Sequence, residues 1–116
     1  MVWDRPWRGR RHPANPARGE VTIRLDGVER RMRLSLGALA ALETRLGAGG
    51  LVALAERFED GSVGAADLAA LIAAGLAGAG EDVGEEAVLA ARIDGGAAAA
   101  LQAGLALLAR SFGQEP

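Results

Sequence analysis

Apolar and polar residues alternate along residues 20–34, which is the period of a half-buried strand. Asp26-Gly27 interrupts this alternation, and the dipeptide is a strong signal for a two-residue type I′ turn, in which both positions need a positive φ. A turn there fixes the register, with Arg24 opposite Glu29 and Glu20 opposite Arg33 as pairs of opposite charge. One face of the predicted hairpin then collects the apolar residues Val21, Ile23, Leu25, Val28, Met32 and Leu34.

The period changes to that of a helix directly after the hairpin. Ser35 is a good N-cap residue, Leu34 and Leu39 stand at the positions of a hydrophobic staple, and Gly47 is a natural residue to follow the last turn. Between these signals, leucines recur at helical spacing, as Leu36, Leu39, Leu42 and Leu46. Because a lone hairpin is marginal in water, we expect this first helix to pack on its apolar face.

Glycine-containing segments separate four further apolar sets at helical spacing. They are Leu51, Leu54 and Phe58; Leu68, Leu71, Ile72 and Leu76; Val88, Leu89 and Ile93; and Leu101, Leu105, Leu108 and Phe112. Phe58 and Phe112 are expected in the core. The predicted fold class is therefore α+β and mostly α, with an N-terminal β-hairpin packed on a small bundle of four to five helices.

Two glycines, Gly75 and Gly104, are predicted inside helices, where glycine costs about 1 kcal/mol relative to alanine. Two explanations remain open for them. They permit close approach of neighbouring helices, or they reflect the Ala-, Gly- and Arg-rich composition expected from a GC-rich genome.

The length of 116 residues is that of one domain. We expect residues 1–18 to be a disordered basic tail, in which five arginines stand against Asp4, and which an early start codon would explain. Residues 19–116 form the predicted domain and carry eight arginines against fourteen acidic residues. No apolar run reaches the roughly 18 residues of a membrane span, and no secretory signal is recognisable, so we expect a cytoplasmic protein.

Residues for catalysis are scarce. The sequence has no cysteine, lysine or tyrosine, and its one histidine, His12, lies in the predicted tail. Ser35, Ser62 and Ser111 have no base to activate them. We therefore expect no catalytic residue, no cofactor and no enzymatic activity.

Three other features admit a binding interpretation. The carboxylates Glu81, Asp82, Glu85 and Glu86 could hold a cation, but acids also suit a solvated loop entering a helix. The glycine-rich stretches 47–50 and 75–80 lack the strand and lysine of a phosphate-binding loop and are interpreted as helix ends. The tail combines arginines with both tryptophans, a combination that can grip nucleic acid, although a solvated arm is the simpler interpretation. No metal site is predicted.

Several stretches of the chain carry a family resemblance. "RLSLGALAALETRLGAGGL", "LAERFEDG", "LAALIAAGLAGAGED" and "ALLARSFG" resemble small tail proteins of gene transfer agents and related siphophage-like elements of α-proteobacteria, from about Ala14 to the C-terminus. The resemblance implies either a tail assembly chaperone or a phage tail tube protein, and it supplies no catalytic residue.

We expect first a tail assembly chaperone, which would bind the tape measure protein, recruit tail tube subunits and act in the cytoplasm during particle assembly. The alternative is a structural tail tube component that remains in the particle. The scarcity of strands argues against the tube, because stacked rings ordinarily need a larger β-sandwich or barrel. A nucleic-acid-binding domain is a second alternative. The sequence does not assign the partner-binding face or the oligomeric state.

Overall fold

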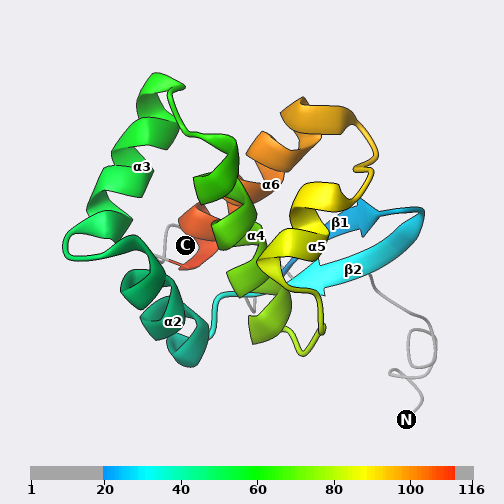
Figure 1. The fold of residues 1–116 in the computed structure, drawn as a ribbon, viewed down its shortest axis with the longest axis horizontal. Coiled ribbons are helices and arrows are strands. Elements are labelled where there is room, and N and C mark those ends of the chain that lie inside the picture. Colours follow the sequence, from blue (N-terminus) through cyan, green and yellow to red (C-terminus); the bar gives the residue numbers. More distant parts are fainter. Residues whose placement is uncertain (1–19, 112–116) are drawn as a thin grey trace, which may run out of the picture.

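A computed structural model describes residues 20–111 of the chain, as a two-stranded antiparallel hairpin followed by five helices (Figure 1). The strands are β1 (Val21–Leu25) and β2 (Val28–Met32). The helices are α2 (Leu36–Leu46), α3 (Gly50–Asp60), α4 (Ala65–Gly78), α5 (Glu85–Ala90) and α6 (Gly96–Ser111). The predicted α+β, mostly helical class is confirmed. The predictions for residues 1–18 and for Phe112 fall outside the described residues.

The hairpin has the predicted register. Asp26 and Gly27 form the turn with φ values of 52° and 80°, as a type I′ turn requires. Arg24 faces Glu29, and their side chains approach to 3.9 Å, although Arg24 lies closer to Asp94, at 3.1 Å. The remaining partners are also those predicted, Val21 with Met32, Thr22 with Arg31, Ile23 with Arg30 and Leu25 with Val28. The pairing of Glu20 with Arg33 stays a prediction.

The apolar face of the hairpin is largely buried. Ile23, Leu25, Met32 and Leu34 all belong to the core. Val28 is an exception to the prediction, because it lies beside the turn and remains 49% exposed.

The first helix begins and ends as predicted. The Ser35 hydroxyl accepts a hydrogen bond from the Ala38 amide at 3.1 Å, and Gly47, at φ 92°, donates its amide to the Glu43 carbonyl. Leu42 is buried, but Leu36 is 83% exposed, which corrects its assignment to the core face. The reason is angular: the buried Ala38 lies two residues, or about 200°, away around the helix.

The hairpin packs on α4 and α6, not on the helix that directly follows it. Strand β2 and helix α2 both pack on α4, and β1 contacts α6 (Figure 1). The expectation that α2 would cover the hairpin is therefore wrong. Leucine spacing identifies the apolar side of a helix but does not identify what that side contacts.

Two glycines of α4 make this docking possible. The Arg33 amide donates a 2.8 Å hydrogen bond to the Gly75 carbonyl. A Cβ added at Gly75 would lie 2.7 Å from Leu107 and 3.1 Å from Met32, and a Cβ at Gly78 would overlap the Arg33 carbonyl oxygen. The close-approach explanation of Gly75 is thus supported by the packing around it.

Gly104 allows a second close approach, between α6 and the helices opposite it. A Cβ there would lie 2.9 Å from the Phe58 ring of α3 and 3.0 Å from Leu68 of α4. Phe58 is half-buried and packs on the core, as predicted. The core centre is α4, in which Leu71, Ile72 and Leu76 are fully buried.

The last two helices differ from the prediction in which residues they bury. In α5, Val88 is buried, while Leu89 is 55% exposed and Ile93 lies beyond the helix, bridged to Leu25. In α6, Leu101 and Leu105 are 38% and 52% exposed. The core side of α6 is instead formed by Ala100, Ala103, Gly104, Leu107 and Leu108.

Within residues 20–111, no helix is by itself long and apolar enough to cross a bilayer. Helices α2 and α3 reach that length and apolarity only when taken together, across an 86° bend.

Candidate functional site

The three serines that could serve as nucleophiles have local structural roles. Ser35 caps α2. The Ser62 hydroxyl donates to the Asp60 carboxylate at 2.6 Å, and the Ser111 hydroxyl donates to the Leu107 carbonyl at 2.6 Å. The Ser35 and Ser111 hydroxyls bond only to backbone groups, which cannot activate them. The hydrogen bond from Ser62 holds the pKa of the Asp60 carboxyl below its ordinary value, so Asp60 is a weak base. His12 lies outside the described residues.

The acidic segment predicted as a loop is held by two arginines from different elements. Glu81 pairs with Arg30 of β2 at 2.8 Å, and its other oxygen accepts from the Arg31 amide at 3.4 Å. Glu85, at the start of α5, accepts two hydrogen bonds from Arg45 of α2, at 2.8 and 3.1 Å. Each hydrogen-bonded guanidinium holds the pKa of its carboxyl partner, Glu81 or Glu85, below the ordinary value.

These pairs engage two of the four acids, Glu81 and Glu85, with arginines of the protein itself. Within residues 20–111, no three Asp, Glu or His side chains gather as metal ligands would. Arg30 is itself informative, because it lies opposite Ile23 on the apolar side of the hairpin. Its ion pair with Glu81 gives this arginine a charged partner and connects the loop after α4 to β2. The segment therefore stabilises the fold.

The glycine-rich stretches allow positive φ values and close contacts at the ends of helices. In residues 47–50, Gly47 and Gly49 take positive φ between α2 and α3. In residues 75–80, Gly75 and Gly78 lie within the last turns of α4, against β2 and Leu107, and Gly80 takes a positive φ after the helix. Both stretches lie at helix ends, as predicted.

Both edges of the hairpin are partly covered by the protein itself. On the β2 edge, the outward amides of Arg31 and Arg33 bond to Glu81 and Gly75. On the β1 edge, the Arg24 carbonyl accepts from the Asp94 amide at 3.3 Å, and the Asp26 amide donates to the Arg92 carbonyl at 2.8 Å. An edge whose backbone groups are already bonded is a poor template for another strand.

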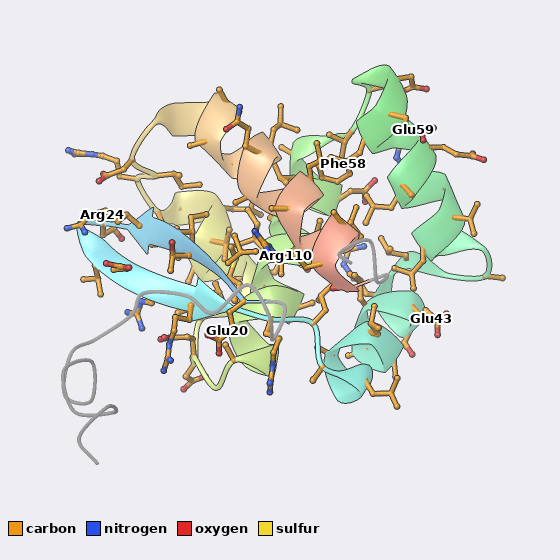
Figure 2. The ribbon with its side chains drawn as sticks, turned by 180° about the vertical axis from the view of Figure 1, so that it is seen from behind. Glu20, Arg24, Glu43, Phe58, Glu59 and Arg110 are labelled. Atoms are coloured by element: carbon orange, nitrogen blue, oxygen red, sulfur yellow. The ribbon has the colours of Figure 1, made fainter. Side chains whose placement is uncertain are left out.

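Exposed apolar residues are found on several elements, and α6 carries the most coherent set. Leu101 and Leu105, one helical turn apart, point away from the core and are exposed. In Figure 1, α4 is nearer to the viewer than α6; in Figure 2, which shows the molecule from behind, α6 is the nearer of the two helices. We call the exposed side of this helix the α6 outer face, which consists of Ala97, Ala98, Leu101, Gln102, Leu105 and Ala109.

The α6 outer face carries no charge. Among the described helices, α2, α3, α4 and α5 each contain at least one acidic residue, whereas α6 contains none and has a single arginine, Arg110, in its last turn. The sequence prediction did not separate this face from the core, because Leu101 and Leu105 share one helical spacing with Leu108. The signal was the run from Gly96 to Ala109 without a charged residue.

The prediction of nucleic-acid binding rests on the tail, which lies outside the described residues. In the described part, arginines 24, 30, 45 and 57 are each paired with a carboxylate. Those paired guanidinium groups are already engaged within the protein.

Comparison with known proteins gives one family. The model of the family described as "Phage tail tube protein, GTA-gp10" matches residues 18–114. No curated protein and no solved structure matches the chain.

Proposed function

We propose that the chain, which belongs to the family described as "Phage tail tube protein, GTA-gp10", is a structural tail component of a phage-like particle of the gene transfer agent type. The family match over residues 18–114 carries this proposal. The sequence alone ranks an assembly chaperone first, but the family description favours the structural alternative. A structural tail subunit needs no catalytic group, which agrees with the local roles of Ser35, Ser62 and Ser111.

The geometry constrains how such a subunit would contact its neighbours. The amides of Arg31 and Arg33 and the carbonyl of Arg24 are already bonded within the protein. A neighbour would therefore meet side-chain surfaces of the helices rather than extend the sheet strand by strand. Contacts of this kind bury apolar side chains and depend on shape more than on backbone hydrogen bonds.

An assembly chaperone is the second candidate, and one observation favours it. The described part contains a single two-stranded sheet beside five helices, and one of those helices leaves Leu101 and Leu105 exposed. Such a surface suits capture of a partner's amphipathic helix. In this role the partners implied by the resemblance are the tape measure protein and the tail tube subunits, bound transiently before the particle is complete.

The composition of purified particles separates the two candidates. Particles would be purified from the producing cells, and the protein quantified by mass spectrometry in particles and in the remaining lysate. A structural component is expected in the particles at a level similar to that of the abundant tail proteins. A protein found in the lysate but missing from complete particles would overturn the proposal and favour the chaperone.

A further inference from the structure

Helix α3 is attached to the rest of the domain through few side chains. Leu54 is its one buried residue, whereas α4 buries six residues and α6 buries five. Figure 1 shows α3 at the side of the molecule opposite the hairpin. Phe58 of α3 is half-buried and reaches Gly104 of α6, where a Cβ would lie 2.9 Å from its ring. Because burial of apolar side chains is the main attraction between packed elements, α3 is held less strongly than the two central helices.

The polar contacts of α3 with other elements are also few. Arg57 of α3 pairs with Asp67 of α4 at 2.7 Å, and both side chains are partly exposed to water, where an ion pair contributes little. The backbone hydrogen bonds at the two ends of α3 are local. The Gly50 amide donates to the Gly47 carbonyl before the helix, and the Ser62 amide donates to the Arg57 carbonyl after it. Among the described residues, no backbone hydrogen bond joins α3 to α4 or α6.

Glycines flank α3 on both sides. Gly47 and Gly49 precede it with φ values of 92° and 71°, and Gly61 follows it with a φ of 77°. No atom lies within 4 Å of a Cβ built at any of these three positions, so the turns are not packed against another element on that side. Glycine adopts positive and negative φ at similar cost, and such positions absorb the backbone rotation that a hinge requires.

Helix α5 provides a comparison, because it also has one buried residue, Val88. The segments on either side of α5 are bonded to the hairpin, however. Glu81, before the helix, pairs with Arg30 of β2, and after the helix the Arg92 carbonyl accepts from the Asp26 amide at 2.8 Å. Within the described part of the chain, the glycine-containing turns on either side of α3 make no such bond to another element.

We infer that α3 is a hinged helix, which leaves its place as one unit while the hairpin and the other helices stay folded. The opening breaks the pair of Arg57 with Asp67. It also uncovers Leu54 and Phe58, together with the surface around Gly104 on which Phe58 packs. Apolar surface that is covered in the closed form thereby becomes available without unfolding of the core formed by α4 and α6. The inference concerns the free protein and goes beyond the proposed tail role, so its failure would leave the particle measurement unaffected.

Hydrogen exchange of the full chain, followed residue by residue by NMR, tests the inference. After correction for intrinsic rates, the interior amides of α3, residues 54–58, are expected to exchange at least about 10-fold faster than those of α4, residues 71–75. Their exchange should report one shared opening and depend weakly on low concentrations of urea, since the opening exposes only the surface under one helix. The same rate and urea dependence in both helices would mean that α3 opens only when the whole domain unfolds. A gradient of rates from the ends of α3 would indicate fraying; either result overturns the inference.

Two leucine substitutions give a matched comparison. Leu54→Ala removes apolar contacts that only the closed form of α3 makes, so it is expected to raise exchange in α3 roughly 30-fold or more. Leu25→Ala alters a similarly buried leucine of β1, 4% exposed against 0% for Leu54. It destabilises the closed and open forms alike, so it should raise exchange in α4 but not in α3. Equal increases in α3 for both variants would contradict the inference, and the wild-type measurement decides the matter if either variant fails to fold.

Discussion

Gly78→Ala tests the docking of the hairpin on α4. Gly78 is the last residue of α4, and an alanine Cβ there would overlap the carbonyl oxygen of Arg33 and come within 3.0 Å of the Ser35 amide. Both neighbours are backbone atoms, so no side-chain rotation relieves the overlap. The end of β2 must move away from the helix instead. That movement weakens the 2.8 Å bond from the Arg33 amide to the Gly75 carbonyl.

The expected cost follows from three contributions. Overpacking in a rigid environment costs about 1–3 kcal/mol, and the weakened hydrogen bond costs about 1 kcal/mol more. Replacement of glycine by alanine in a helix offsets at most about 1 kcal/mol of this. We therefore expect Gly78→Ala to lower the free energy of unfolding by about 2 kcal/mol. For a domain of this size the melting temperature would fall by roughly 8–16 °C.

Gly37→Ala is the matched control. Gly37 lies in α2, where the nearest atom to an added Cβ is the Ser35 hydroxyl at 4.0 Å. This substitution gains helix propensity without a clash and is expected to stabilise the protein by up to about 1 kcal/mol. Urea unfolding of the full chain, followed by circular dichroism, measures both variants. If Gly78→Ala proves as stable as Gly37→Ala, the close contact between β2 and α4 is refuted.

Four further substitutions test the ion pair, the cap and the orientation of α6. Glu81→Gln is expected to lower the free energy of unfolding at neutral pH. Because the folded-state pKa of Glu81 lies below its ordinary value of 4.5, the difference from wild type should shrink as the pH falls through the folded-state pKa. A difference that stays constant in acid would contradict the pairing with Arg30. Ser35→Ala should cost about 1 kcal/mol in urea unfolding, through loss of the N-cap bond, and no loss would show that the cap is dispensable. Leu107→Ala should cost about 2–5 kcal/mol by cavity formation, whereas Leu105→Ala in the free monomer should cost far less, and equal losses would mean that α6 is rotated.

The hairpin was predictable because its information is local. Asp26-Gly27 selects a turn type, the turn sets the register, and alternation chooses the buried face. The Ser35 cap is local in the same sense, since it depends on residues three positions apart. Sequence reasoning performs well where one short segment contains both partners of an interaction.

The partner of the hairpin was not predictable in this way. Ser35 and the leucines after it indicate that a helix follows, but the hairpin docks on α4, which begins thirty residues later. The determining residues are Gly75 and Gly78, and their contribution is the absence of a side chain. An absence has no hydrophobic period, so pattern analysis does not detect it.

The buried side of α6 could not be identified from the sequence for a related reason. Leu101, Leu105 and Leu108 are spaced as a helical stripe, and large residues dominate such patterns. The buried side instead uses Ala100, Ala103 and Gly104, whose small size lets α6 approach its neighbours closely. The candidate interaction surface was therefore not distinguished from the core, although its lack of charge is visible in the sequence.

Labelling of intact particles tests the proposed tail role most directly. The protein would be replaced in the producing cells by a version with a C-terminal epitope tag, and purified particles would be imaged by electron microscopy with gold-conjugated antibody. We predict gold at repeated positions along the tail, as expected for a structural member of the phage tail tube family. Tails that carry no label, from cells in which the tagged protein is expressed and supports particle production, would contradict the account.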